Sequence, residues 1–367
     1  MDPAGVQPQI PSCFQIHEIV TIIAEILLAT GRDLIRYHAD GTAGPVEFDQ
    51  PDYASVAFFA RTCQATVGPG LRVLWSHQEG LEHLIKTLPR DARAFKFSLT
   101  RYISCSEWER FDYYASLIQT LSVKYDGWSL RWAPEVIAAL HVRQTSLRRD
   151  LLPNLREVKL KTLEGDDHPS YAFFFLSRLL GSISITAGNV PSYTAWLKSF
   201  ISYLPLSSPH LESITLKLEY LEKNPLPLEI ESASSWSNLS TFNCEYSVTL
   251  STALQLVQLP KLGALSLVVP AANTDPAPSH PIAHTARNVK RLGISSHILL
   301  DHCVFPSLET IEIRPGSQNE LRSSLESIQK RCDLELLHGV EIMCPEMKGD
   351  PTKIDDFAPP RSLDLSL

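Results

Sequence analysis

The 367-residue sequence lacks the features of a membrane protein or a nucleic-acid-binding protein. Its 33 Lys and Arg residues are outnumbered by 41 Asp and Glu residues, so the net charge is −8. A protein that binds nucleic acid or an anionic membrane surface generally needs an excess of basic residues. The most apolar stretch, residues 16–29, is interrupted by Glu18 and Glu25 and is too short to cross a bilayer. We therefore expect no nucleic-acid partner and no membrane insertion.

The cysteines do not form a recognisable metal or disulfide framework. There are seven, an odd number, and no two have the Cys-x-x-Cys spacing that metal and redox sites favour. Cys63 and Cys244 fall at apolar positions, where a free thiol acts as a small hydrophobe. The first twelve residues also lack the basic start and apolar run of a signal peptide. We predict reduced thiols, no metal site, and a cytoplasmic or nuclear location.

Catalytic motifs are missing as well. The sequence contains no H-E-x-x-H, G-x-S-x-G, Walker loop or G-x-G-x-x-G. The triplet Asp166-Asp167-His168 is typical of a solvated polar turn. Glu107 and Glu109 are one residue apart, which suits a surface better than an acid/base pair. The sequence therefore predicts a protein that is not an enzyme and binds no cofactor.

One apolar pattern recurs after residue 150. It consists of an apolar residue, two of any kind, an apolar residue, one of any kind, and an apolar residue. Its first positions lie 25, 31, 28, 23, 27 and 19 residues apart, around the length of a leucine-rich repeat. Units of this size cannot bury their own apolar faces and must stack on one another. The seven triads are Leu155/Val158/Leu160, Leu180/Ile183/Ile185, Leu211/Ile214/Leu216, Leu239/Phe242/Cys244, Leu262/Leu265/Leu267, Val289/Leu292/Ile294 and Leu308/Ile311/Ile313.

Each triad predicts a short strand with one buried face. In the first triad, Val158 and Leu160 alternate with Glu157, Lys159 and Lys161, which is the two-residue period of a half-buried strand. Stacking such strands produces a parallel sheet along the concave side of an arc.

The segments between the predicted strands favour helices on the convex side. Apolar residues at helical spacing occur in residues 171–180, 193–204, 248–259 and 319–332. A proline stands two residues before four of the triads, where it ends a helix and favours an extended entry to the strand. These prolines are Pro153, Pro209, Pro260 and Pro306. The predicted fold class is therefore an α/β leucine-rich-repeat solenoid over residues 91–344.

The outward residues of the predicted strands are the candidate target-binding residues. Two interpretations remain open for this concave face: a hydrated surface without a ligand, or a protein-recognition surface of the kind that repeat arrays present. The second interpretation predicts that a target protein is bound by Glu157, Lys159, Lys161, Thr215, Lys217, Asn243, Arg291, Glu312 and Arg314.

Residues 14–90 do not follow the repeat and predict a small all-α unit between a tail, residues 1–13, and the solenoid. Ile16, Ile19, Val20 and Ile23 share one face of a first helix that Gly31 ends. A second helix is predicted over residues 53–67, a break at residues 68–70, and a third helix from residue 71. Residues 345–367 are predicted to form a C-terminal tail.

Three short motifs of this N-terminal unit carry a family resemblance. They are Ile16-His-Glu-Ile19-Val20, Phe58-Phe-Ala-Arg-Thr-Cys63 and Leu71-Arg-Val-Leu-Trp75. Together they resemble the F-box, with its L-P-x-E-I-L start, central V-C and terminal L-W. The layout of the whole chain is similar to that of the F-box proteins with leucine-rich repeats that are numerous in mushroom-forming fungi.

The resemblance implies a substrate receptor of a cullin–RING ubiquitin ligase, monomeric outside its complex. Its F-box would bind a Skp-type adaptor, which joins it to the cullin complex, and its repeats would hold an unknown target protein. The residues implied in adaptor binding are Ile16, Ile19, Val20, Ile23, Cys63, Leu71, Leu74 and Trp75. The alternative is a non-ligase interaction scaffold with a degenerate F-box-like cap. It is favoured by His17, which replaces the usual proline, and by the long segment 31–52.

Overall fold

The computed structural model describes residues 17–30, 52–92, 99–125, 134–147, 149–162, 170–187, 191–218, 227–231, 233–270, 284–315, 318–333, 335–343 and 365–366. The chain forms two compact units. The first comprises Met1–Arg90 and Ile103–Leu121, and the second comprises Asp91–Tyr102 and Ser122–Leu367. Residues 103–121, which were predicted to belong to the repeat array, thus group with the N-terminal unit. Ile16, the 1–13 tail and most of the 345–367 tail lie outside the described residues.

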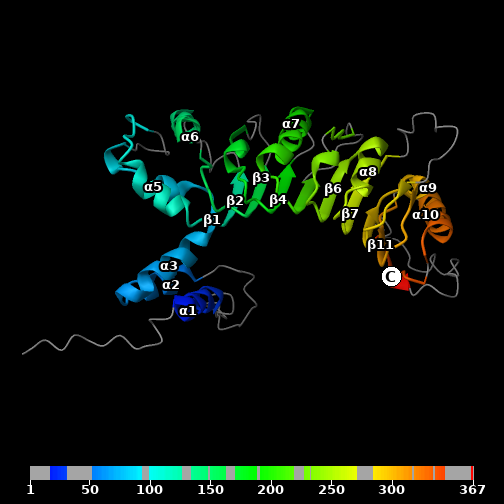
Figure 1. The fold of residues 1–367 in the computed structure, drawn as a ribbon, viewed down its shortest axis with the longest axis horizontal. Helices are drawn as coiled ribbons and strands as arrows, with labels where there is room; N and C mark the ends of the chain where they lie inside the picture. The colour runs from blue at the N-terminus through cyan, green and yellow to red at the C-terminus, as the bar shows by residue number, and fades with distance from the viewer. Residues whose placement is uncertain are drawn as a thin grey trace, which may run out of the picture. The chain divides into compact units, whose positions relative to one another are not determined.

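The first unit is mainly helical (Figure 1). Its elements are α1 (His17–Thr30), α2 (Tyr53–Ala60), α3 (Gln64–Ser76), β1 (His77–Glu79), α4 (Glu82–Ile85) and α5 (Trp108–Ala115). One buried residue from each of the first three helices, Ala24, Val56 and Val73, forms a common core. Asp52 caps α2 by accepting a hydrogen bond of 2.9 Å from the backbone N–H of Ser55.

The break between α2 and α3 lies earlier than the sequence pattern predicts. The chain leaves the helix at Arg61–Cys63, and α3 then runs through residues 68–70 without interruption. Thr66 stabilises the new start, because its hydroxyl accepts a hydrogen bond of 3.3 Å from the Cys63 N–H. Gly70 serves packing, since a Cβ atom there would lie 2.5 Å from the Cβ of Ala60. The glycine lets α2 and α3 approach closely and does not break the helix.

The second unit is built on a parallel sheet. In the described residues its strands follow the order β2 (Thr120–Tyr125), β3 (Glu157–Thr162), β4 (Ser182–Ala187), β5 (Ser213–Leu218), β6 (Thr241–Ser247), β7 (Ala264–Val268), β9 (Arg291–Ile294), β11 (Thr310–Ile313), β12 (Gly339–Ile342) and β13 (Leu365–Ser366). Every neighbouring pair from β3 to β13 is parallel. A separate parallel pair joins β8 (His284–Thr285) and β10 (Cys303–Val304). The α/β class with a parallel sheet is therefore as predicted.

The middle residues of the triads lie in register across this sheet. All 21 triad residues are buried, which gives the strands one continuous apolar face. An eighth residue, from β12, lies outside the seven predicted triads and extends the row. The row consists of Val158, Ile183, Ile214, Phe242, Leu265, Leu292, Ile311 and Val340.

Helices of the second unit cover that apolar face. Figure 1 places α6 (Pro134–Leu147), α7 (Pro191–Ser207) and α8 (Leu250–Val257) along one side of the strands. Further along the chain follow α9 (Ile298–His302) and α10 (Gln318–Arg331). Short 3₁₀ helices occupy Arg90–Ala92, Ser170–Phe175 and Ala233–Ser235. None of the described helices is long and apolar enough to cross a membrane.

The helix predicted over residues 171–180 is only partly present. Its first half is the 3₁₀ helix Ser170–Phe175, and the chain then turns at Arg178 and Leu179. The buried hydroxyl of Ser177 donates a hydrogen bond of 2.9 Å to the carbonyl of Leu155 in the preceding triad. This tertiary bond competes with helix continuation, because serine favours bonding to nearby backbone groups over a helix interior.

A repeated backbone device links successive strands at their start. In each case one carbonyl oxygen accepts two N–H groups from the next unit, at 2.8 to 3.0 Å. The acceptors are Arg156, Gly181, Glu212, Ser240, Gly263 and Lys290. These bonds satisfy backbone groups that would otherwise be unpaired at the turns, and they fix the register from one strand to the next.

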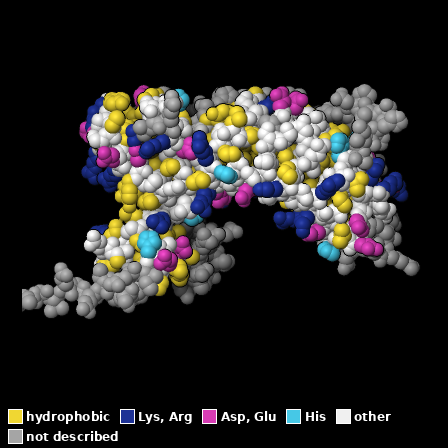
Figure 2. All heavy atoms as spheres, in the orientation of Figure 1, with side chains coloured by type: hydrophobic (Ala, Val, Ile, Leu, Met, Phe, Trp, Pro, Cys, Tyr) yellow, Lys and Arg dark blue, Asp and Glu magenta, His cyan; other side chains and the backbone are white. Residues whose placement is uncertain are grey.

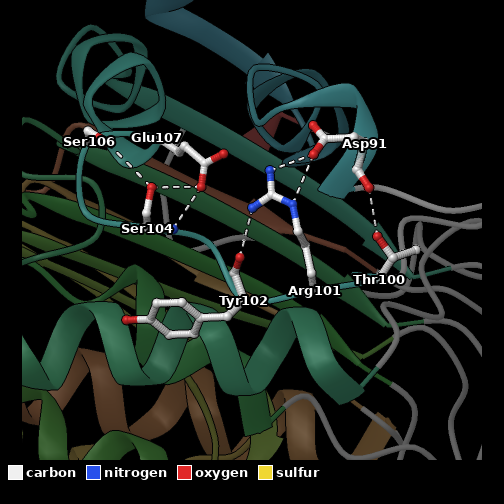
Figure 3. Close-up of polar contacts among 7 residues, drawn as sticks. All are labelled: Asp91, Thr100, Arg101, Tyr102, Ser104, Ser106 and Glu107. Atoms are coloured by element: carbon white, nitrogen blue, oxygen red, sulfur yellow. Dashed lines mark hydrogen bonds and ion pairs between the residues drawn. The ribbon is translucent and has the colours of Figure 1, made fainter.

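A charged cluster joins Asp91 to Thr100, Arg101 and Tyr102, within the second unit (Figure 3). The Arg101 guanidinium donates to Oδ2 of Asp91 through Nε (2.9 Å) and Nη2 (2.7 Å), and through Nη1 to the carbonyl of Tyr102 (2.9 Å). The Thr100 hydroxyl donates to the Asp91 carbonyl at 2.8 Å. The two hydrogen bonds hold Arg101 against Asp91 more firmly than a single exposed ion pair would.

A second polar cluster in Figure 3 belongs to the first unit, just before α5. Glu107 Oε2 accepts hydrogen bonds from the Ser104 N–H (2.8 Å) and the Ser104 hydroxyl (2.7 Å). The carboxylate thereby satisfies a backbone donor ahead of the helix, as a capping group does.

Candidate protein-interaction surfaces

The open face is the side of the sheet opposite α6, α7 and α8, formed by the strand residues that alternate with the buried triads. All nine predicted target-binding residues lie on it, and none of them is buried. Lys159, Thr215, Asn243 and Glu312 share one row of the register, and Glu157 and Arg291 share the neighbouring row. The structure therefore gathers residues that are more than 150 positions apart in the sequence.

Several members of this face were not predicted. Ser182, Ser184 and Thr186 of β4 occupy its outward positions, and the period of the second triad would have identified them. Glu341 lies next to Glu312 on the neighbouring strand. The sequence could have predicted the strand that carries Glu341, because Leu337, Val340 and Ile342 have the same spacing as the seven triads.

Charge is unevenly distributed over the open face. Strands β2 to β5 carry the basic residues Lys124, Lys159, Lys161 and Lys217 and one acid, Glu157, whose Oε1 lies 2.9 Å from Lys159 Nζ. Glu245 of β6 borders this group, because its Oε2 accepts a hydrogen bond of 3.0 Å from the Leu218 N–H of β5. Figure 2 shows dark blue Lys and Arg side chains over the strands of the second unit, with acidic side chains among them. The balance on these four strands is basic although the whole chain carries a net charge of −8.

The other end of the open face is mixed in charge. Glu245, Glu312 and Glu341 surround Arg314, and the Arg314 Nε donates to Glu312 Oε1 at 2.5 Å. The hydrogen bond with Glu312 raises the pKa of Arg314 above its ordinary value. Arg291 adds one further cation on β9.

A hollow of about 440 Å³ lies on the open face over β6 to β12. Small residues form its floor, because Ala264, Ser266, Gly293 and Gly339 leave space that larger side chains would fill. A Cβ atom at Gly293 would lie 2.7 Å from the Ser266 hydroxyl oxygen, so a larger residue there would require the Ser266 side chain to move. The amide oxygen Oδ1 of Asn243, also in the lining, is buried without a hydrogen-bond partner among the described residues.

The N-terminal unit uses part of the predicted adaptor set for its own packing. Val20 is fully buried, so it holds α1 in the unit and is not available to a partner. Trp75 stacks on Tyr114 with ring centroids 4.3 Å apart. Ile19 is 37% exposed. The remaining described members, Ile23, Cys63, Leu71 and Leu74, are half-buried.

Instead, other apolar residues of this unit face outward. Ile22 and Ile26 of α1 are 52% and 56% exposed, and Phe58 of α2 is 70% exposed. Ile19, Ile22 and Ile26 have the spacing of one helical face. We call Ile19, Ile22, Ile26 and Phe58 the outer apolar residues. Ile22 and Ile26 were not predicted, because α1 is apolar on two sides and the predicted set followed another face. Phe58 of α2 was also outside the predicted set.

A second hollow, of about 370 Å³, belongs to the first unit. Tyr53, Leu74 and Trp75 provide its apolar walls, and His77, Gln78, Glu79 and His83 its polar ones. Burial, with a smaller contribution from Glu79, raises the pKa of Tyr53. In the described part of the chain, no group of three or more His, Cys, Asp or Glu residues is arranged to hold a metal ion.

The chain matches no protein-family model, and comparison with curated proteins gives no similar sequence. Its class is defined by its own fold: an α/β protein with a parallel sheet covered by helices on one side.

Proposed function

We propose that this protein is the target-recognition subunit of an SCF-type ubiquitin ligase. The N-terminal unit acts as an F-box that binds a Skp-type adaptor and thereby a cullin. The second unit is a leucine-rich-repeat solenoid whose concave, open face holds the target. The protein itself performs no chemistry, since the charged ubiquitin is delivered elsewhere in the assembly, in the cytoplasm or the nucleus.

The proposal that the second unit is a repeat solenoid is supported by the regular spacing of its triads and the regular contacts between its strands. Seven triads of the same spacing contribute strands to one sheet, with their middle residues in one row. The doubly accepting carbonyl recurs at the start of successive strands. Strands of unrelated origin would not be expected to share both the register and the hydrogen-bond pattern. Repeats that stack on one another in the same way share both, because each unit meets the next with the same geometry.

The outer apolar residues are the observation that carries the adaptor-binding part. Fully burying one isoleucine or phenylalanine side chain contributes about 1.5–3 kcal/mol. Leaving four of them exposed on a unit this small forgoes that stabilisation unless a partner covers them. Ile19 belongs to the first motif of the F-box resemblance and Phe58 to the second, and Ile22 and Ile26 follow the first motif on the same helix.

Co-expression of the full chain with a Skp-type adaptor tests the proposal. Wild type is expected to co-purify with the adaptor in equal amounts. The double variant Ile22→Glu/Ile26→Glu should lose the adaptor, because two carboxylates would be desolvated in the interface. Leu206→Glu is the matched control, since Leu206 is 80% exposed on α7 of the other unit. If wild type fails to co-purify, the ligase role is wrong.

A second candidate is a scaffold that keeps an F-box-like cap but binds no adaptor. It is favoured by one observation: Val20 and Trp75, both implied in adaptor binding by the resemblance, are engaged within the unit. The scaffold predicts that wild type and the Ile22→Glu/Ile26→Glu variant behave alike, both remaining free of adaptor.

A further inference from the structure

The open face has a basic half and, beyond it, a hollow bordered by two carboxylates, and both restrict what the face can bind. Lys124, Lys159, Lys161 and Lys217 form the basic half, on β2 to β5, and Glu157 is the acid among them. Glu245 of β6 lies at the border of this half and leaves it with an excess of positive charge. Lys124 and Lys217 are exposed. Lysines held within a few strands of one another attract an acidic partner, because their fields add over a short distance.

The strands beyond the basic half change in character. The hollow over β6 to β12 has a floor of small residues, so a chain can approach the sheet there. At its far side Glu312 and Glu341 occupy facing positions on β11 and β12. Two carboxylates side by side repel each other. Arg314 offsets part of this charge, but it is also shared with Glu245.

We propose that the open face binds an extended segment of the target whose acidic residues lie over the basic half and whose Lys or Arg residue lies beside Glu312 and Glu341. The inference rests on the proposed function for the identity of the partner, and it adds the chemistry of the segment and its orientation. The acidic end lies toward β2, and the basic end lies toward β12.

The geometry also sets the spacing of the two ends. Lys217 on β5 and Glu312 on β11 are separated by four steps in the strand order. Neighbouring strands lie about 4.8 Å apart, and an extended chain rises about 3.3 Å per residue. The separation is therefore about 20 Å, or roughly six residues of an extended segment.

A random library of twelve-residue peptides, selected on the full-length protein, tests this inference. The expected result is enrichment of peptides with clustered Asp or Glu residues and with a Lys or Arg about six positions away. Enrichment without charge bias, or of basic clusters, would overturn the proposal. So would binding of a twelve-nucleotide oligouridine more tightly than the best peptide, because the basic half would then serve RNA.

Charge reversal on the protein, tested with the selected peptide, supplies the control. Lys124→Glu/Lys217→Glu is expected to weaken peptide binding about tenfold or more, since like charges then meet across the interface. Lys330→Glu places the same kind of charge change at an exposed position on α10 and should leave binding unchanged. Equal binding by wild type and both variants overturns the inference.

The adaptor experiment separates the two proposals. The Ile22→Glu/Ile26→Glu variant is expected to keep peptide binding, because its changes lie in the first unit. Adaptor binding without selective peptide binding would refute the segment chemistry alone. Selective peptide binding without adaptor binding would refute the ligase role and leave the binding site standing.

Discussion

Trp75 and Tyr114 stack face to face, with ring centroids 4.3 Å apart and 28° between their planes. The two residues come from separate stretches of the first unit, α3 and α5. The stack is one of the contacts that join residues 103–121 to this unit, together with the hydrogen bond from the Gln119 N–H to the Ser76 carbonyl. It also gives Trp75 an internal role, whereas the resemblance assigned it to adaptor binding.

Replacing Trp75 with alanine is expected to lower the free energy of unfolding by about 2–3 kcal/mol, because the ring's burial and stacking are both lost. Tyr114→Phe keeps the stack and should change it by less than about 0.5 kcal/mol. Urea denaturation followed by far-ultraviolet circular dichroism measures both. Equal stability of Trp75→Ala and wild type would mean that the stack contributes nothing to the fold.

Gly70 and Gly68 form a matched pair for testing the contact between α2 and α3. Gly70→Ala is expected to destabilise the protein by about 1–3 kcal/mol, because its Cβ would lie 2.5 Å from that of Ala60. Gly68 has nothing within 4 Å of the added atom. There the gain in helix propensity is offset by the restriction before Pro69, so the change should stay within about 0.5 kcal/mol. Similar melting temperatures for the two variants would contradict the close approach.

Two buried thiols in the described part of the chain make stability depend on alkaline pH. Burial raises the pKa of both Cys244 and Cys303 from 9.0 to about 12. As the pH passes 9, the unfolded chain loses these protons and the folded chain keeps them. The stabilisation is thus complete below pH 9 and is lost between pH 9 and 12, at up to about 1.4 kcal/mol per pH unit for each thiol.

Urea unfolding at a series of pH values from 8 to 11 measures this effect. In Cys244→Ala, stability should fall less steeply with pH than in wild type. The difference should approach about 1.4 kcal/mol per pH unit, which corresponds to one proton. Cys63 is the contrasting thiol, because its hydrogen bond with Thr66 lowers its pKa. Iodoacetamide should therefore modify Cys63 in the folded protein and leave Cys244 intact. Early modification of Cys244 would show that its side chain is not held in the core.

The parallel sheet could be predicted because its cause is local and repeated. Each triad indicates which residues are buried, and Leu155, Val158 and Leu160 are all buried. Strand β12 could have been predicted in the same way, because Leu337-His-Gly-Val340-Glu-Ile342 has the spacing of a triad. The pattern does not reveal that Glu312 and Glu341 lie side by side, since register between distant strands is a tertiary property.

The N-terminal unit was harder to predict, for two physical reasons. Helix α1 is apolar on two sides, so periodicity alone does not tell Val20, which is buried, from Ile22, which is exposed. Gly70 carries the usual mark of a helix break, but its role is decided by Ala60 of another helix. Local pattern indicates that these helices exist, and packing decides which face each one buries.

The most direct test of the account is calorimetric titration of the full chain with a purified Skp-type adaptor. A 1:1 complex is predicted, with affinity at least about tenfold weaker for Ile22→Glu/Ile26→Glu and unchanged for Leu206→Glu. Absence of binding by the wild-type chain, or equal binding by all three proteins, would contradict the claim that the outer apolar residues are an adaptor surface.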